Sequence, residues 1–556
     1  MIDENMYEID ASVLVPYDVL KNSGHVDRFC DIVLTDGVTT FRADHLIEEK
    51  VGEYHMVPIN INEDTLKQVD KIKESLSTSN LTETLKTLGV KEQNDLCKEI
   101  TNKFDCYRKH INECTKREID FIVKSNNLKG PNGEFLPAKD FNLIFKIDNE
   151  SFFLRPELAQ SQFTNFDRIY KFANGKFPLG SFSIGKSYRN EINAKGGMLR
   201  TKEFIQAEIE YFTLNNNHPN FIDVSDLEVC LLPNNADVSF KLSLKESLEQ
   251  NIICSESIAY FIGKAYLFLL ELGFDPLTVR FRQHKPNEMA HYANECWDAE
   301  VLTLSGWIEC AGIADRGCFD LTCHKNNINS MVNIEIPPKK VKILKVDKKS
   351  FIKELKSLYD EFEEECEKVD SEKIESVGEC DFYELEFKGK IYKVPIVEKE
   401  IKSINKIPNV IEPSFGISRI LYALIEQKFI IENERFILAL KPSLCYKHLV
   451  ITTLRISSDY NDLLSKIRKD LKKSFIRYEF NNRSCSIGRR YATSDELGIP
   501  YFATADPDSL KDHMITLRDR DSTQQVRILI KDLISTVEDL VNEKITWESL
   551  FKQFGI

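Results

Sequence analysis

The chain has no run of about 18 consecutive apolar residues, the length that a membrane-spanning helix needs. Its first residues, MIDENMYEID, are acidic and hold no apolar stretch, so they resemble neither a secretory signal nor an Arg-rich transit peptide. No internal repeat or low-complexity segment interrupts the 556 residues. With 42% hydrophobic and 29% charged residues, the sequence predicts a soluble cytoplasmic protein of two or three domains with no membrane partner.

Paired C-x2-C spacing is also missing from the 14 cysteines. Scattered cysteines without an export signal are typical of reduced thiols rather than of a disulfide framework. The tightest cluster is Cys310, Cys318, Cys323 and His324; buried small side chains are favoured there over metal ligation, and we expect no zinc. The net charge of −14 argues weakly against nucleic-acid binding, although it hides local basic patches.

The pattern of apolar residues divides the chain into zones. Residues 1–50 alternate short apolar runs with turns, which predicts strands. Residues 52–140 are polar and helical in period, as in Leu81, Leu85 and Leu88, then Phe104, Tyr107 and Ile111. Residues 141–325 carry alternating strands, and residues 326–408 predict a helix at 350–367 and a hairpin, YELEFKGKIYKV, that turns at Gly389.

After an apolar helix at residues 417–427 the pattern changes. HLVITTL reads as a buried strand, and DYNDLLSKIRKDLKKSF as an amphipathic helix with a basic face. MITLRDR reads as another strand, and QVRILIKDLISTVEDLV as a second amphipathic helix. Alternating strands and helices favour a small α/β domain from residue 441 onward.

The most unusual stretch is KSYRNEINAKGGMLRTKEFIQAEIEYF, residues 186–212, which reads as two strands joined by a turn. Side chains two apart on a strand share a face, so this hairpin would gather cations, carboxylates and an aromatic ring on one face. Its members are Arg189, Glu191, Arg200, Lys202, Phe204, Gln206, Glu208 and Glu210. Such a face is costly to bury in an apolar core, so it lines a polar cleft or meets solvent as a salt-bridged hairpin.

This hairpin resembles motif 2 of the class II aminoacyl-tRNA synthetases, with Tyr188-Arg189-Asn190-Glu191 on one arm and Arg200-Thr201-Lys202-Glu203-Phe204 on the other. The longer pattern resembles the eukaryotic and archaeal type of the glycyl-tRNA synthetase family. The resemblance covers nearly the whole chain, because further strings occur in the family's order: FRADH (41–45), LRPELAQ (154–160), NEMAHYA (287–293), GWIECAGIADRGCFDLTCH (306–324), NVIEPSFGISR (409–419), SIGRRYATSDELG (486–498) and TLRDRDS (516–522).

The resemblance implies an α+β fold: a class II antiparallel-sheet catalytic core over residues 1–437, with insertions at about 52–140 and 326–408, then an α/β anticodon-binding domain at 438–556. It implies ATP-dependent attachment of glycine to tRNA(Gly) through a glycyl-adenylate, a side synthesis of diadenosine tetraphosphate, and a homodimer. The family's long helix ahead of MYEID-like residues, which builds the dimer interface, is not in the sequence. Either the true start lies upstream or this is a shortened form, which puts the dimer in question.

Adenylate formation depends on positioning and fixed positive charge. By the resemblance, the catalytic residues are Arg189, for the α-phosphate and substrate carboxylate, and Arg419, for the adenine face or γ-phosphate. Arg200 binds the γ-phosphate, Glu191 the adenine amino group, and Phe204 stacks on adenine. The expected ATP contacts also include Asn190, Thr201, Glu309 and Cys310, with Glu309 as a Mg²⁺ ligand.

For glycine, the resemblance makes Glu157, Glu208 and Glu412 the ligands of the ammonium group, with Pro413 and Ser414 closing the pocket. Three carboxylates around one point repel one another unless a cation lies between them, so we expect the ammonium to be that cation. The alternative for Glu157 is a surface ion pair with Arg155.

In the C-terminal segment, a basic helix face suits tRNA phosphates, with an ordinary solvated face as the alternative. It consists of Lys466, Lys469, Lys472, Lys473 and Arg477, and the most family-like strings add Arg489, Arg490 and Arg518. Two other identities are open to the sequence. Another class II synthetase is disfavoured by the three glutamates and EPSFG, and a non-catalytic paralogue is disfavoured by the intact ATP residues.

Overall fold

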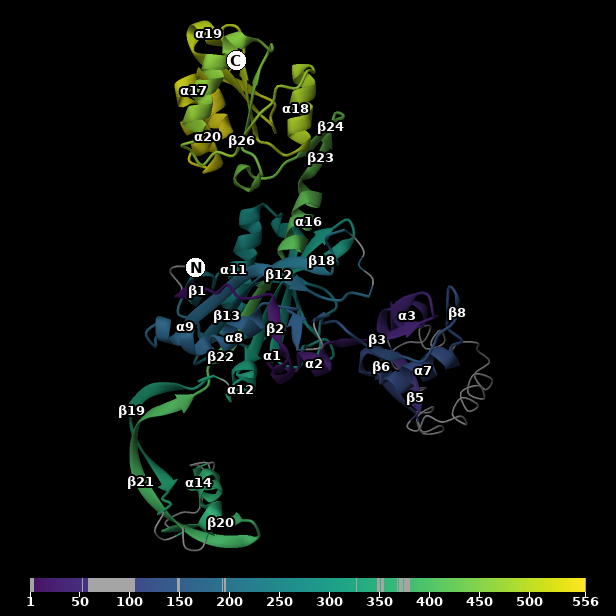
Figure 1. The fold of residues 1–556 in the computed structure, drawn as a ribbon, viewed down its shortest axis with the longest axis vertical. Coiled ribbons are helices and arrows are strands. Elements are labelled where there is room, and N and C mark those ends of the chain that lie inside the picture. The colour runs from purple at the N-terminus through teal and green to yellow at the C-terminus, as the bar shows by residue number, and fades with distance from the viewer. Residues whose placement is uncertain are drawn as a thin grey trace. The chain divides into compact units, whose positions relative to one another are not determined.

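The computed structural model describes residues 5–52, 54–58, 106–147, 151–192, 194, 197–326, 328–347, 351, 355–367, 369, 374 and 381–555 (Figure 1). The chain forms two compact units. One combines the residues up to His324 with those from Asn409 onward, and the other is Lys325–Pro408, nearly the span of the expected second insertion. Among the described helices, none has the length and apolar character to span a bilayer.

A nine-stranded sheet organises the first unit. Its order is β1 (Met6–Glu8), β12 (Leu179–Tyr188), β13 (Glu203–Thr213), β22 (Asn409–Phe415), β18 (Gly306–Gly317), β17 (Glu295–Thr303), β16 (Val279–Gln283), β14 (Glu228–Leu232) and β15 (Phe240–Ser243). The pairs β1–β12 and β14–β16 are parallel and the others are antiparallel. A mostly antiparallel sheet with helices packed on it confirms the α+β prediction.

The two faces of this sheet have different tasks. Tyr211, Ile313 and Ile411 point to one face, where they pack into the main core with helices α11 (Glu256–Leu272) and α16 (Ile417–Lys428). The other face is met by α8 (Ala159–Thr164), which contacts β12 and β13 (Figure 1). Because successive side chains alternate, the even-numbered residues of β13 and β22 point to this second face. The same alternation therefore fills the core and supplies polar groups to a cleft.

Smaller elements surround this sheet. Short helices within the N-terminal residues are α1 (Tyr17–Asn22), α2 (His25–Arg28) and α3 (Ala43–Lys50), so the prediction of strands there is only partly right. The strands of this region are β2 (Leu14–Pro16), β3 (Cys30–Thr35), β4 (Thr40–Arg42), β9 (Lys139–Asn142), β10 (Lys146–Ile147) and β11 (Phe152–Leu154). The other elements are β7 (Lys129–Gly130), β8 (Gly133–Glu134), α9 (Phe166–Phe172), α10 (Leu244–Glu249), α12 (Phe319–Cys323) and the hairpin β23 (Phe429–Glu432) with β24 (Arg435–Leu438).

The first expected insertion contains β5 (Tyr54–Pro58), β6 (Cys106–His110) and α7 (Lys116–Ser125), in which Thr115 and Glu118 form a capping box. Tyr107 lies in β6, so the helical period assigned to it was wrong: it pairs with Val57 across a two-stranded ladder. Leu81, Leu85, Leu88 and Phe104 lie outside the described residues.

The second unit contains a three-stranded sheet, β19 (Val332–Leu344), β21 (Lys390–Lys406) and β20 (Phe382–Phe387), with α14 (Tyr359–Glu367). Strands β20 and β21 confirm the predicted hairpin, and Gly389 has the positive φ of 79° that its turn requires. The described part of the predicted helix at 350–367 is a 3-10 turn, Lys356–Leu358, followed by α14.

The C-terminal residues form a separate five-stranded sheet, β26 (Tyr478–Phe480), β25 (Leu449–Thr453), β27 (Tyr501–Ala505), β28 (Met514–Asp519) and β29 (Gln525–Leu529). Its helices are α17 (Asn461–Leu471), α18 (Ile487–Glu496), α19 (Ser509–Asp512), α20 (Leu533–Val541) and α21 (Trp547–Phe554). The α/β prediction is confirmed, but QVRILIKDLISTVEDLV is not one helix. Val526 and Ile528 alternate into the core as strand β29, and helix α20 begins only at Leu533.

Candidate active site

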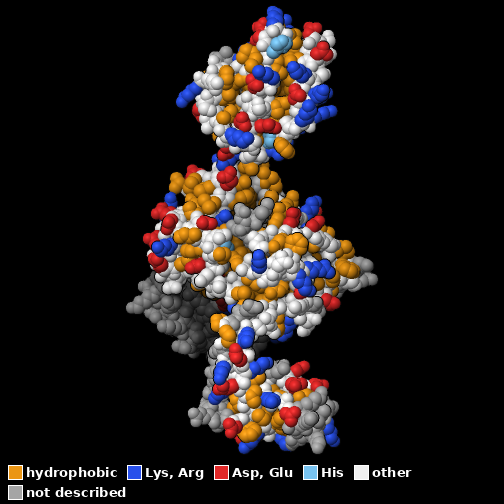
Figure 2. All heavy atoms as spheres, turned by 90° about the vertical axis from the view of Figure 1, so that its left-hand side faces the viewer, with side chains coloured by type: hydrophobic (Ala, Val, Ile, Leu, Met, Phe, Trp, Pro, Cys, Tyr) orange, Lys and Arg blue, Asp and Glu red, His pale blue; other side chains and the backbone are white. Residues whose placement is uncertain are grey.

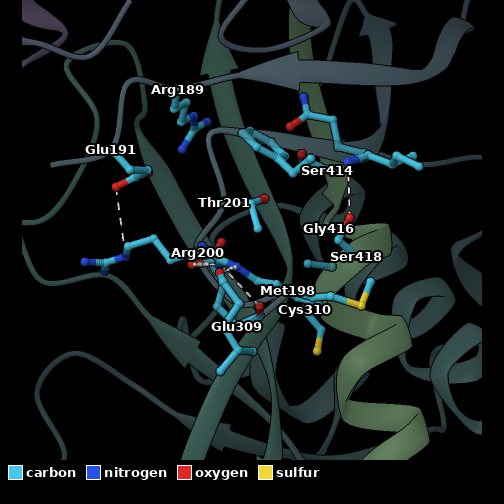
Figure 3. Close-up of a pocket in the computed structure, with 16 residues that line it drawn as sticks. Arg189, Glu191, Met198, Arg200, Thr201, Glu309, Cys310, Ser414, Gly416 and Ser418 are labelled. Atoms are coloured by element: carbon cyan, nitrogen blue, oxygen red, sulfur yellow. Dashed lines mark hydrogen bonds and ion pairs between the residues drawn. The ribbon is translucent and has the colours of Figure 1, made fainter. Parts of the chain in front are cut away.

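A polar pocket opens where the β12–β13 hairpin meets β18, β22 and the start of α16 (Figure 3). Of the residues assigned to ATP, eight line it: Arg189, Glu191, Arg200, Thr201, Phe204, Glu309, Cys310 and Arg419. Asn190 is not among the lining residues, and its backbone N–H donates to the carbonyl of Leu143 at 2.7 Å. The structure thus brings together side chains that are more than 200 positions apart in the sequence.

Three arginines give this pocket its positive charge. The Arg189 guanidinium lies 5.4 Å from the centre of the Phe204 ring, and its Nε donates to the carbonyl of Pro156. Arg200 approaches Glu191 at 4.0 Å. Arg419 binds Glu309 at 2.9 Å and donates to the carbonyl of Leu199. Phosphate oxygens could therefore meet guanidinium groups from both arms of the hairpin and from α16.

Two residues of the pocket also make hydrogen bonds that connect the elements around it. The carbonyl of Cys310 accepts from the N–H of Gly416 at 2.9 Å, which ties β18 to the start of α16. Burial raises the pKa of the Cys310 thiol to about 12, so it is a poor nucleophile. The Oγ of Ser418, at the start of α16, accepts from the N–H of Ile205 on β13 at 3.2 Å.

A buried carboxylate cluster adjoins the pocket on the same face of the sheet. The register places Glu208 opposite Ser414, and Ser414 opposite Gly312. The Ser414 hydroxyl, which lines the pocket, donates to Glu208 at 3.2 Å, and the N–H of Leu158 donates to the other Glu208 oxygen. Pro413 alternates with Ser414, so its side chain points to the opposite face and does not reach the cluster.

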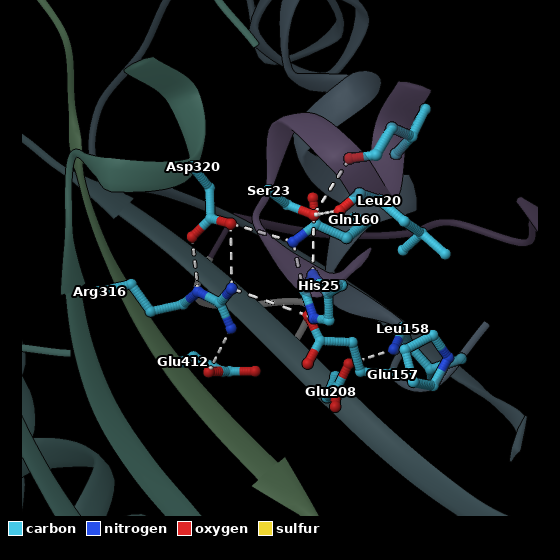
Figure 4. A network of polar contacts seen from close by, with 12 residues as sticks. Leu20, Ser23, His25, Glu157, Leu158, Gln160, Glu208, Arg316, Asp320 and Glu412 are labelled. Atoms are coloured by element: carbon cyan, nitrogen blue, oxygen red, sulfur yellow. Dashed lines mark hydrogen bonds and ion pairs between the residues drawn. The ribbon is translucent and has the colours of Figure 1, made fainter. Parts of the chain in front are cut away.

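The cluster holds a cation of its own, Arg316 (Figure 4). This fully buried guanidinium binds Asp320 at 2.7 Å and Glu412 at 2.9 Å, and lies 3.8 Å from Glu157. Glu157 also contacts His25 at 3.1 Å. The sequence-based argument that only a bound substrate could neutralise the glutamates was therefore incomplete.

The alternative for Glu157 was wrong. Arg155 donates to the carbonyls of Lys186 and Ala11, and Glu157 is buried rather than at the surface. The alternative of a fully solvated hairpin was also wrong, because Glu208 and Glu210 are 3% and 0% exposed.

The ionisation of the cluster is uneven. Burial would raise the pKa of Glu157, but His25 and Arg316 outweigh it and hold that pKa well below its usual range. Burial, with the nearby charges of Glu412 and Glu157, raises the pKa of Glu208 to about 8. Burial also raises the pKa of Glu412, although Arg316 opposes it. At neutral pH the empty cluster therefore carries fewer negative charges than carboxyl groups.

Several members of this network were given no role from the sequence: His25, Gln160, Arg316 and Asp320 were missed, and Glu210 was placed on the charged face of the hairpin without a function. Gln160 bridges Asp320 at 3.0 Å and His324 at 2.9 Å. The signal for Arg316 and Asp320 was present in the string ADRGCFDL, but no role could be assigned before the strand register was known. Cys310 lines the pocket, whereas His324 contacts Gln160 in the carboxylate network. The sequence cluster of Cys310, Cys318, Cys323 and His324 is not among the groups of described residues that could hold a metal ion.

The basic residues of the C-terminal domain fall into an exposed group and a buried group. Lys466, Lys469, Lys472 and Lys473 are exposed, and Figure 2 shows Lys and Arg side chains clustered at an edge of this domain. Arg490 and Arg518 are buried instead: Arg490 binds Thr452 and Thr453, and Arg518 makes a two-pronged pair with Asp495 at 2.8 and 3.0 Å. Arg489 is exposed, and Arg477 donates to the carbonyls of Ser443 and Cys445.

Residues 448–540 match the family model described as "Anticodon binding domain". An antiparallel catalytic sheet with an arginine-lined pocket, joined to such a domain, defines a class II aminoacyl-tRNA synthetase. Among curated proteins, the chain is 39% identical to the glycine--tRNA ligase of Encephalitozoon cuniculi, covering 98% of this chain and 90% of that protein. It is 34% identical to the glycine--tRNA ligase of Methanocaldococcus jannaschii (98% and 91% covered) and to glycine--tRNA ligase 1, mitochondrial, of Saccharomyces cerevisiae (99% and 84% covered).

The chain therefore belongs to the glycine--tRNA ligase family. It is an aminoacyl-tRNA synthetase, and the family resemblance of the sequence is confirmed.

Proposed function

We propose that this enzyme joins glycine to ATP as a glycyl-adenylate in the two adjoining sites and then transfers the glycyl group to tRNA(Gly). The observation that carries this proposal is the position of Ser414 between the two sites. Its side chain lines the arginine-rich pocket and also donates a hydrogen bond to Glu208 in the carboxylate cluster. A carboxylate held beside Ser414 would have a phosphate site on one side and an ammonium site on the other.

In the ATP site, Phe204 stacks on adenine and Glu191 accepts from its amino group. Arg189 binds the α-phosphate and the glycine carboxylate, and Arg200 and Arg419 bind the γ-phosphate. The guanidinium groups place fixed positive charge where negative charge spreads over the phosphate oxygens, which lowers the barrier without a protein nucleophile. The 5.4 Å contact of Arg189 with Phe204 supports a shared substrate-binding role for these two side chains.

A divalent cation suits this site, and Glu309 is the residue we propose to hold it. Its carboxylate is half exposed at the pocket wall, as an oxygen donor for Mg²⁺ needs to be. The ion pair with Arg419 would be shared or exchanged on ATP binding. The cation would supply charge neutralisation at the phosphates, while Arg189 and Arg200 orient them.

In the glycine site, Glu208 and Glu412 accept from the ammonium group, with Glu157 behind them. Glycine offers no side chain to hold, so selection depends on excluding larger amino acids. In this proposal a methyl group would have to fit beside Ser414, which lines the pocket and donates to the buried Glu208. A clash of this kind can exceed the roughly 1–3 kcal/mol available from affinity for one extra methylene.

The remaining parts of the proposal concern partners and place of action. The exposed lysines near α17 bind tRNA phosphates, and the enzyme acts as a homodimer in the cytoplasm. A side synthesis of diadenosine tetraphosphate stays a prediction that no described residue tests.

Amino-acid-dependent exchange of pyrophosphate into ATP tests the adenylate step. We expect exchange with glycine and much less with alanine or serine. The variant Glu208→Gln should raise the KM for glycine by at least about tenfold, which corresponds to 1.4 kcal/mol, and leave the KM for ATP nearly unchanged. Glu203→Gln is a matched control, because Glu203 lies on the same strand in an exposed ion pair with Lys186. No exchange with any amino acid would refute the proposal, and equal losses for both substrates would remove Glu208 from the ammonium site.

A further inference from the structure

Glu210 lies at the bottom of the carboxylate cluster. It follows Glu208 by two residues on β13, so both side chains point to the same face. The pairs Glu208–Ser414 and Tyr211–Ile411 place it opposite Glu412. Its side chain is 0% exposed, and in the part of the chain that the structure describes neither of its carboxyl oxygens has a hydrogen-bond partner.

Carboxyl oxygens of Glu208, Glu210 and Glu412 lie within 4.8 Å of one another. The neighbouring cation, Arg316, gives Glu210 no hydrogen bond, because its guanidinium donates to Asp320 and Glu412. Both oxygens of Glu208 already accept from other donors, Leu158, Ser414 and Gln206. Among the described residues, an ionised Glu210 would therefore be a buried charge that accepts no hydrogen bond.

Such a charge is among the most expensive groups in a protein interior, and the carboxyl group escapes the cost by keeping its proton. Burial raises the pKa of Glu210 well above its usual range; Glu412, Glu208 and Asp320 add to the rise, and Arg316 opposes it. A protonated carboxyl group also changes from an acceptor into a donor, and the nearby Glu412 carboxylate is an acceptor.

We propose that Glu210 is a positioning residue of the glycine site: as a neutral carboxylic acid it donates a hydrogen bond to Glu412 and holds that carboxylate toward the substrate ammonium. Arg316 binds one oxygen of Glu412 at 2.9 Å, so Glu210 would fix the orientation from a second side. The ammonium of glycine then meets an oriented carboxylate without a further unpaired charge beneath it. This inference rests on the proposed role of Glu412 in binding glycine.

Two substitutions separate the donor from the charge. Glu210→Gln keeps a neutral donor of the same shape, whereas Glu210→Met keeps the length and removes the donor. We expect the KM for glycine of Glu210→Gln to stay within about threefold of wild type, and that of Glu210→Met to rise about tenfold, the loss of one hydrogen bond. The KM for ATP should stay constant in both variants. Glu208→Gln provides the behaviour of a charged ligand for comparison.

Infrared difference spectroscopy of wild type against Glu210→Gln reads the protonation state without any activity. We expect a carboxylic-acid C=O band in the wild-type protein that is lost in the variant. The proposal is overturned if that band is absent, if Glu210→Gln loses glycine affinity as Glu208→Gln does, or if Glu210→Met binds glycine like wild type. Absence of glycine-dependent exchange in the wild-type enzyme would instead refute the proposed function, and the infrared result would still stand.

Discussion

Replacing Arg316 by Met tests whether a resident cation holds the carboxylate cluster together. The Arg316 side chain is fully buried and makes hydrogen bonds of 2.7 and 3.0 Å to Asp320 and of 2.9 Å to Glu412. Methionine has a similar length and is apolar, so it removes the charge and the donors while leaving little cavity. The change leaves both acids without their guanidinium partner.

Breaking a buried ion pair by removing one partner costs about 3–5 kcal/mol, because the other charge stays buried and uncompensated. We therefore expect Arg316→Met to lower the free energy of unfolding by about 3–5 kcal/mol at pH 8. The loss should shrink at lower pH. Arg316 opposes the rise in the pKa of Glu412, so its removal raises that pKa further. A carboxyl group with a raised folded-state pKa contributes stability that is present at low pH and lost as the pH rises through that pKa.

Urea unfolding at pH 6 and pH 8, followed by tryptophan fluorescence, measures the effect on the transition that contains the catalytic sheet. Arg168→Met is the matched control, because the Arg168 side chain is exposed and donates to Asn165, the N-cap of its own helix; its change should lie within about 0.5 kcal/mol. Glycine KM should rise in Arg316→Met. A change of under about 1 kcal/mol at pH 8 with unchanged glycine KM would refute the assignment of Arg316 as the compensating cation.

Three further outcomes follow from the same structure. Because the pKa of Glu208 is raised to about 8, the stability that Glu208 contributes to the glycine-free enzyme is lost as the pH rises from about 4.3 through 8. Glycine favours the ionised form of Glu208, so the rise in Tm that glycine causes should grow from pH 6 to pH 8.5 when measured by calorimetry. A rise in Tm that does not change with pH would contradict this. Replacing Lys469 and Lys472 together by Ala should reduce the slope of log K for tRNA binding against log salt by about 2. The control Lys511→Ala removes an exposed lysine of another helix and should leave the slope unchanged; a reduced slope in this control would place the phosphate contact elsewhere. Arg518→Met should destabilise the C-terminal domain by about 1.5–3 kcal/mol without changing glycine-dependent exchange, because Asp495 loses its two hydrogen bonds from Arg518 but keeps the one from Arg435; a loss of exchange in the folded variant would argue against this purely structural role.

Long periodic segments and family strings were the predictable part of this protein. The apolar period of residues 417–427 predicted α16, and the turn at Gly389 predicted the hairpin of the second unit. The N-terminal helices failed because α1 and α2 are only six and four residues long, too short for a period to appear. The stretch at 525–541 failed because its two-residue alternation in β29 runs directly into the helical period of α20.

The site residues also divide into those that the family strings predict and those that depend on the folded structure. Family strings named Glu208, Glu412 and the arginines, whose residue types match the chemistry of their substrates. They did not reveal Arg316, because its role depends on the register of β18 against β22, which brings its guanidinium to Glu412. They placed Pro413 with its neighbours, yet strand alternation turns its side chain away.

The attachment of the second unit bears on how evolution could add it. The chain leaves the catalytic sheet after β18 and returns in β22, and Gly317 of β18 is the register partner of Val410 in β22. In between, Val332 pairs with Lys406, so the paired strands β19 and β21 bring the two ends together. The cost in chain entropy of closing a loop rises by only about 0.6 kcal/mol for each doubling of its length. A self-paired insertion of this kind can be gained, lengthened or exchanged for a short turn while β18 and β22 keep the register that holds Arg316 against Glu412.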